Sequence, residues 1–156
     1  IQAEPDDPDK VAYIARRQER ELRRTIRTLQ SEFDDPFATA MFAARDDVED
    51  LYRVRVDMVC GYDADMDARL AVLVEATREA MINAAKHSGS RLIRVHCSQT
   101  GHHVTVLVRD EGSGFDTDAV TPRSIARRLD HVGGTASFQA TEEFGTEVEM
   151  TMPKVG

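Results

Sequence analysis

The sequence lacks several features that define large classes of protein. No segment approaches the run of about 20 apolar residues that crosses a membrane, and the acidic start at Ile1 to Pro5 lacks the apolar stretch of a signal peptide. Basic side chains are outnumbered by acidic ones, 20 against 28, and the formal net charge is −8. Polyphosphate binding needs clustered Lys and Arg. We therefore expect no nucleic-acid partner and no membrane contact in this fragment.

Cysteine is also scarce. Cys60 and Cys97 both fall in strand-like runs and lack the close pairing of a zinc site. Two buried thiols suit a reducing cytosol. The 156 residues predict one domain with room for an appendage, and a hydrophobic content of 41% is enough to close a core.

Two helices are predicted in the N-terminal part. Asp7-Pro8-Asp9 is typical of a helix start, and apolar residues then recur every three or four positions as far as Leu29. The other positions of this helix are strongly basic. Its narrow apolar stripe indicates packing against a partner helix, and a basic surface for acidic partners is the alternative. Asp35-Pro36 repeats the start signal and predicts a second, amphipathic helix that reaches Leu51.

The rest of the chain predicts an α+β two-layer sandwich. The expected elements are a strand at 54–58, a helix from Met66 that ends at Gly89, strands at 93–97 and 104–108, an irregular stretch at 116–122, a helix at 124–131, and strands at 136–140 and 148–152. In this order the helices would cover one face of a mixed, mostly antiparallel sheet.

The long predicted helix carries polar residues on the side opposite its apolar positions. At roughly 100° per residue, Glu79 and Asn83 fall within about 40° of each other, with Lys86 beside them. Asn83 offers a neutral oxygen suited to Mg²⁺, Lys86 offers a point charge for a phosphate, and Glu79 could act as a base. A solvated helix face is the simpler alternative for these three residues.

A second group of candidates follows the strand at 104–108. Asp110 stands where that strand runs into a loop that contains Gly112 and Gly114. An ionised carboxylate can accept a hydrogen bond from an exocyclic amine, and the glycines let the backbone approach a flat ring closely. An ordinary Asp/Gly turn is the alternative, because Gly-x-Gly alone is a weak signal.

Taken together and in order, these residues resemble a known domain, the ATP-binding GHKL (Bergerat-type) catalytic domain of sensor histidine kinases. The matching segments are Glu79-x-x-x-Asn83-x-x-Lys86-His87, Asp110-x-Gly112-x-Gly114-Phe115 and Gly145-Thr146-x-Val148. Arg20-Glu21-Leu22-Arg23 is similar to the end of the dimerisation helices in the nitrate-sensor and desaturase-sensor subfamily. The resemblance implies that residues 1–30 end a dimerisation and phosphotransfer helix and that residues 31–156 form the catalytic domain.

The resemblance also implies ATP and Mg²⁺ as cofactors and a role for each matching residue. Glu79 would be the catalytic base and Asn83 the metal ligand. The remaining cofactor-binding residues would be Lys86 and His87 at the phosphates, Asp110 at the adenine amine, Gly112 and Gly114 around the adenine, and Thr146 nearby.

The implied activity is transfer of the ATP γ-phosphoryl group to a histidine outside this chain, because none of its five histidines stands in the family's phosphoacceptor context. The implied partners are the dimerisation domain that carries this histidine, a response regulator of a two-component system, and a second copy in a full-length homodimer. The implied location is the cytoplasmic portion of a membrane-anchored sensor.

The segment before the predicted helix at 124–131 departs from the family pattern. Family members carry Gly-x-Gly in this lid and offer its backbone amides to phosphate, whereas residues 119–125 contain no glycine and the interval is several residues short. Missing residues would explain this, because lids order mainly around nucleotide. The alternatives are a degenerate lid on a non-catalytic nucleotide-binding or scaffold module, and an anti-sigma-factor serine kinase, against which the basic helix around Arg20 argues.

Overall fold

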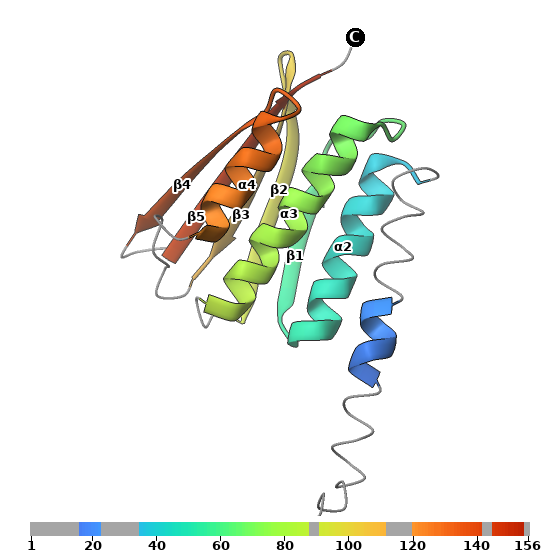
Figure 1. The fold of residues 1–156 in the computed structure, drawn as a ribbon, viewed down its shortest axis with the longest axis vertical. Helices are drawn as coiled ribbons and strands as arrows, with labels where there is room; N and C mark the ends of the chain where they lie inside the picture. Colours follow the sequence, from blue (N-terminus) through green and yellow to red (C-terminus); the bar gives the residue numbers. More distant parts are fainter. Residues whose placement is uncertain (1–15, 23–34, 88–90, 112–119, 142–144, 155–156) are drawn as a thin grey trace, which may run out of the picture.

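The computed structural model describes residues 16–22, 35–87, 91–111, 120–141 and 145–154. They form a two-layer α+β sandwich, in which the helices α2 (Phe37–Tyr52), α3 (Ala68–His87) and α4 (Val120–Asp130) lie side by side on one face of a five-stranded sheet (Figure 1). The predicted fold class is confirmed. No helix within the described ranges is long and apolar enough to cross a membrane.

The helices begin close to where the sequence places them, with one exception. α2 spans Phe37–Tyr52, directly after Pro36, and α3 spans Ala68–His87. α4 spans Val120–Asp130 and so begins earlier than the predicted 124. Pro122 lies in the first turn of α4, where a missing backbone N–H costs no helical hydrogen bond. The irregular stretch expected at 116–122 is therefore wrong for residues 120–122.

The sheet has the order β1-β2-β3-β5-β4. Its strands are β1 (Arg55–Cys60), β2 (Leu92–Thr100), β3 (His103–Asp110), β4 (Thr135–Thr141) and β5 (Gly145–Pro153). β1 pairs with β2 in parallel, and the other neighbouring pairs are antiparallel. The parallel pair requires a crossover connection, and α3 provides it.

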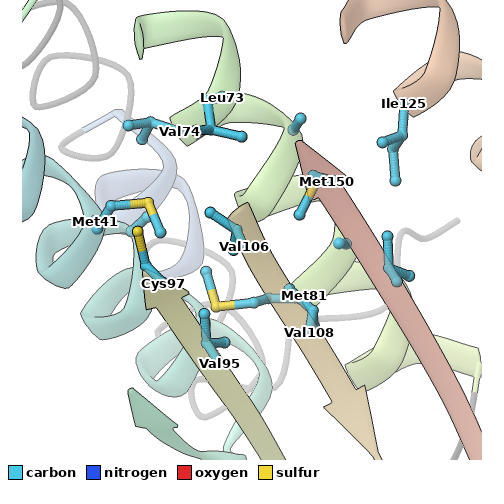
Figure 2. Close-up of a cluster of buried hydrophobic side chains, with 14 of the residues drawn as sticks. Met41, Leu73, Val74, Met81, Val95, Cys97, Val106, Val108, Ile125 and Met150 are labelled. Atoms are coloured by element: carbon cyan, nitrogen blue, oxygen red, sulfur yellow. The ribbon is translucent and has the colours of Figure 1, made fainter. Parts of the chain in front are cut away.

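The core fills the space between the two layers. Alternate strand residues point towards the helices, so the period of two in the sequence becomes one buried face. Figure 2 shows this cluster with side chains from both layers, among them Met41, Leu73 and Met81 from the helices and Val95, Val106, Val108 and Met150 from the strands. The sheet face that turns away from the helices carries Arg94, His96 and Arg109.

Two sequence predictions fall largely outside the described residues. Of the basic helix expected at 7–29, residues 16–22 are described and are helical. This segment contacts α2, because Arg20 Nε lies 3.3 Å from a carboxylate oxygen of Asp50. The expected domain boundary at residue 30 and residues 112–119 lie outside the described ranges. Of the glycine-free lid interval at 119–125, residues 120–125 are described and belong to α4.

Candidate functional site

Asn83 lies in the C-terminal half of α3 and is buried, with 7% of its surface exposed. The sequence pattern places Asn83 on the side of the helix opposite the apolar positions, away from the core. The difference arises because α3 lies between α2 and α4 (Figure 1), and most of its residues are buried or half-buried. The side-chain nitrogen of Asn83 has no hydrogen-bond partner among the described residues. Burying an amide without a partner costs about 1–3 kcal/mol. A polar ligand that contacts Asn83 would remove this cost.

Glu79 lies one helical turn before Asn83 on the same side of α3. Its Oε2 atom is buried and has no hydrogen-bond partner within the described part of the chain. Within the described ranges its ion-pair partner is Arg128 of α4, whose Nη2 lies 3.6 Å from this oxygen. The side chain of Glu79 is 24% exposed and that of Arg128 is 42% exposed, so the pair is open to solvent on one side.

Asp110 ends β3 and is buried. It continues the alternation of Val104, Val106 and Val108 and therefore points to the helix-covered face, with 2% of its surface exposed. The backbone N–H of Thr146, at the start of β5, donates to Oδ1 of Asp110 over 3.4 Å. A carboxylate in this position requires hydrogen-bond donors, because a buried charge without them is costly. The contact with Thr146 fixes the orientation of the Asp110 carboxylate.

The topology brings these residues to one end of the molecule. Figure 1 shows that the C-terminal ends of α3 and β3 and the N-terminal end of β5 lie at the same end of the sandwich. Asn83 lies near this end in the helical layer, and Asp110 and Thr146 lie near it in the sheet. All three are buried.

The remaining candidates are placed differently. Lys86 is exposed, and its Nζ lies 6.0 Å from the centre of the Tyr52 ring, so it points towards α2 and away from α4. His87 is the last residue of α3, but its side chain is outside what the structure describes, as are Gly112 and Gly114.

Sequence reasoning missed two arginines that hold this part of α3. One is Arg128, described above. The other is Arg78, which is buried and donates from Nη1 to Asp47 of α2 over 2.9 Å, with Glu75 at 3.3 Å from its Nε. An arginine within a helix gives no sequence signal of a partner on another helix, so these contacts depend on how the helices pack.

The residues fit Mg²⁺ better as part of a nucleotide complex than as a protein cage. Within the described ranges, no group of three or more His, Cys, Asp or Glu residues could hold a metal ion. Mg²⁺ commonly uses one or two protein oxygens and completes its shell with phosphates and water. The carboxamide of Asn83 suits that role.

Sequence comparisons find relatives among signalling proteins, although no family model matches the chain. The nitrate/nitrite sensor protein NarQ of Escherichia coli K12 is 31% identical over 146 residues, which cover 88% of this chain and 25% of NarQ. The signal transduction histidine-protein kinase/phosphatase DegS of Bacillus subtilis 168 is 27% identical over 114 residues, which cover 65% of this chain and 29% of DegS. The chain thus spans between a quarter and a third of each relative.

Solved structures share the fold. The ATP-binding domain of PrrB from Mycobacterium tuberculosis matches with a TM-score of 0.65 at 21% identity, covering 78% of this chain and 97% of that one. The histidine kinase domain of the blue-light-activated kinase EL346 from Erythrobacter litoralis matches with a TM-score of 0.63 at 16% identity, covering 75% and 60%.

Proposed function

We propose that this chain is the ATP-binding catalytic domain of a two-component sensor histidine kinase and that it binds Mg·ATP between α3 and the end of the sheet. In this proposal it passes the γ-phosphoryl group to a histidine on a dimerisation domain. The observation that carries the proposal is the pair of buried polar side chains, Asn83 and Asp110, at the same end of two facing layers.

Asp110 and Thr146 would recognise the adenine. An ionised carboxylate accepts hydrogen bonds only, so Asp110 suits the exocyclic amine of adenine. The Thr146 N–H holds one carboxylate oxygen and so sets the direction from which the amine is met. Gly112 and Gly114 would line the same part of the pocket.

Asn83, Lys86 and His87 would hold the phosphate end of the nucleotide. Mg²⁺, when bound, would neutralise charge on the phosphate oxygens. Asn83 would contribute its carboxamide oxygen to the metal. Lys86 would leave the Tyr52 ring to reach a phosphate, and this change costs little because cation–π contacts at exposed sites contribute about 0.5–1 kcal/mol.

Glu79 would accept the proton that the imidazole of the partner histidine loses. In that step a nitrogen–phosphorus bond forms as the bond from the γ-phosphorus to the bridging oxygen of ADP breaks. Arg128, at 3.6 Å, would hold the Glu79 carboxylate in position. Positioning and charge neutralisation supply most of the catalysis in phosphoryl transfer.

The proposals for the full-length protein rest on its similarity to sensor histidine kinases. We propose that the full-length protein is a homodimer, that its phosphoacceptor histidine lies outside residues 1–156, and that a response regulator receives the phosphoryl group. A cytoplasmic location of this domain belongs to the same proposal.

Titration calorimetry with a non-hydrolysable ATP analogue and Mg²⁺ tests the site. The wild-type chain should bind, and Asp110→Asn should weaken binding by about 1–3 kcal/mol because the amide can present a donor to the adenine amine. Asp57→Asn, on the opposite face of the sheet, is the matched control and should bind as the wild type does. Equal affinity in Asp110→Asn and the wild type would refute the assignment of the adenine site.

The second candidate function is a non-catalytic scaffold, and one observation favours it. α4 begins at Val120, so only residues 111–119 separate it from the end of β3, and that interval has no glycine after Gly114. In the same calorimetry experiment, no heat and no shift of the melting temperature with the wild-type chain would select the scaffold.

A further inference from the structure

The sheet places the two cysteines of the chain directly opposite each other. Cys60 is the last residue of β1, and its Cα is the register partner of the Cα of Cys97 in β2. Both side chains lie on the face that the helices cover. Cys97 is fully buried and Cys60 is partly buried. Figure 2 shows Cys97 pointing from its strand into the space between the layers.

The register places the two thiols side by side on this face. Cys60 Sγ donates to the backbone carbonyl of Tyr62 over 3.2 Å. The neighbouring Cys97 thiol lowers the pKa of Cys60 from its ordinary 9.0 to about 7, against the opposing effects of burial and the Asp63 carboxylate. The Cys60 thiol, together with burial, raises the pKa of Cys97. Near neutral pH, Cys60 is thus the nucleophile of the pair, and Cys97 keeps its proton.

Cys60 is the more accessible of the two thiols. It is partly buried and lies on β1, an edge strand of the sheet, whereas Cys97 is fully buried in the neighbouring strand. An oxidant in solution therefore meets Cys60 first.

We propose that Cys60 and Cys97 form a reversible disulfide, so that this end of the sheet is a thiol-oxidation site separate from the nucleotide site. The separation follows from the register. Asp110 pairs with Ile93, near the start of β2, whereas Cys97 lies further along that strand beside Val106.

A glutathione-type disulfide supplies the oxidant for a balanced reaction. The Cys60 thiolate attacks one sulfur of the disulfide and expels the first glutathione thiolate. Cys97 then loses its proton to solvent, attacks the Cys60 sulfur and expels the second. Two protein thiols are oxidised, and one small disulfide is reduced to two thiols.

Strand geometry permits this bond and makes it easy to reduce. Neighbouring strands lie about 4.8 Å apart, within the roughly 4.4–6.8 Å between Cα atoms that a disulfide spans. The Cβ atoms of a disulfide lie only about 3.8 Å apart, so the bond would pull β1 towards β2. Strained disulfides are the more readily reduced ones.

Intact mass measurement on the folded 156-residue chain tests the proposal. After incubation with oxidised glutathione at neutral pH, the mass should fall by that of two hydrogen atoms, and dithiothreitol should restore it. The chain has two cysteines, so an intramolecular disulfide can only be this one. Cys97→Ala should stop at a glutathione adduct on Cys60, and Cys60→Ser should not react while it stays folded.

The pH dependence of alkylation gives a readout that a purely structural role would not change. The rate of Cys60 modification should rise with a midpoint near 7 in the wild type and at a clearly higher pH in Cys97→Ala, where the neighbouring thiol is absent. A stable glutathione adduct on the wild-type chain, a disulfide that forms only in denaturant, or the same alkylation midpoint in both proteins would overturn the proposal.

Discussion

The two flanks of α3 are built differently, although the same helix forms both. On the side of α2, Arg78 and Asp47 form an ion pair at 2.9 Å, with side chains 6% and 9% exposed. On the side of α4, Glu79 and Arg128 stand 3.6 Å apart and are partly open to solvent, and Asn83 keeps a buried nitrogen without a partner among the described residues. The α2 flank is tightly paired, although Arg78 Nε there is also buried without a hydrogen-bond partner among the described residues. The α4 flank is more open to solvent and is therefore the one that a ligand can reach.

The largest effect is expected on the paired flank. Asp47→Ala leaves the Arg78 guanidinium buried without its main partner and should lower the free energy of unfolding by about 3–5 kcal/mol. Urea denaturation measures this loss. The matched control is Asp46→Ala, whose carboxylate is exposed and pairs with Arg45 at the surface. The control should change stability by less than about 0.5–1 kcal/mol. Equal losses in the two variants would show that the α2 flank does not anchor the helix.

The second prediction concerns the α4 flank, where one substitution should change ligand binding much more than it changes stability. Asn83→Ala removes a buried amide that lacks a partner, so the free energy of unfolding should change by no more than about 1 kcal/mol. Mg²⁺-dependent nucleotide binding should be lost, and calorimetry with and without Mg²⁺ measures it. Unchanged Mg²⁺-dependent affinity would contradict the role of Asn83, and a large loss of stability would mean that the two flanks do not differ as described.

The polar residues of α3 could be found from sequence because they lie on one helix. A period of 3.6 residues is enough to place Glu79 and Asn83 on a common side, and the alternation of β3 is enough to place Asp110 at a strand end. That these groups arrive at the same end of the molecule follows from the order of the elements, which the sequence also predicted correctly. Their roles in binding stay predictions.

Packing between elements could not be read from the sequence. The burial of Asn83 depends on the neighbours of α3, and the direction of Lys86 depends on Tyr52 of α2. The register of β1 against β2 brings Cys60 to Cys97 across the whole length of α3. Long-range contacts of this kind are set by the tertiary arrangement, and no local pattern around either cysteine indicates them.

The smallest effect on stability is expected for a substitution of Arg128. This substitution tests whether the ion pair on the α4 flank serves catalysis and not stability. Arg128→Ala removes a partly exposed ion pair, so it should cost only about 0–1 kcal/mol of unfolding free energy. If Arg128 positions Glu79 for proton transfer, the variant should lower kcat for phosphorylation of the dimerisation domain and leave the KM for ATP nearly unchanged, because in this proposal Glu79 would act on the acceptor and not on the nucleotide.

Arg128→Lys tests whether charge alone is sufficient. A lysine keeps the positive charge but has a different shape and reach from a guanidinium, so partial recovery of kcat is expected. Arg127→Ala is the matched control, because Arg127 is the exposed neighbour on the same turn of α4 and no ion pair of its side chain is found among the described residues. If Arg127→Ala and Arg128→Ala lowered kcat equally, the contact with Glu79 would have no specific role. The open flank would then differ from the paired one only in its exposure.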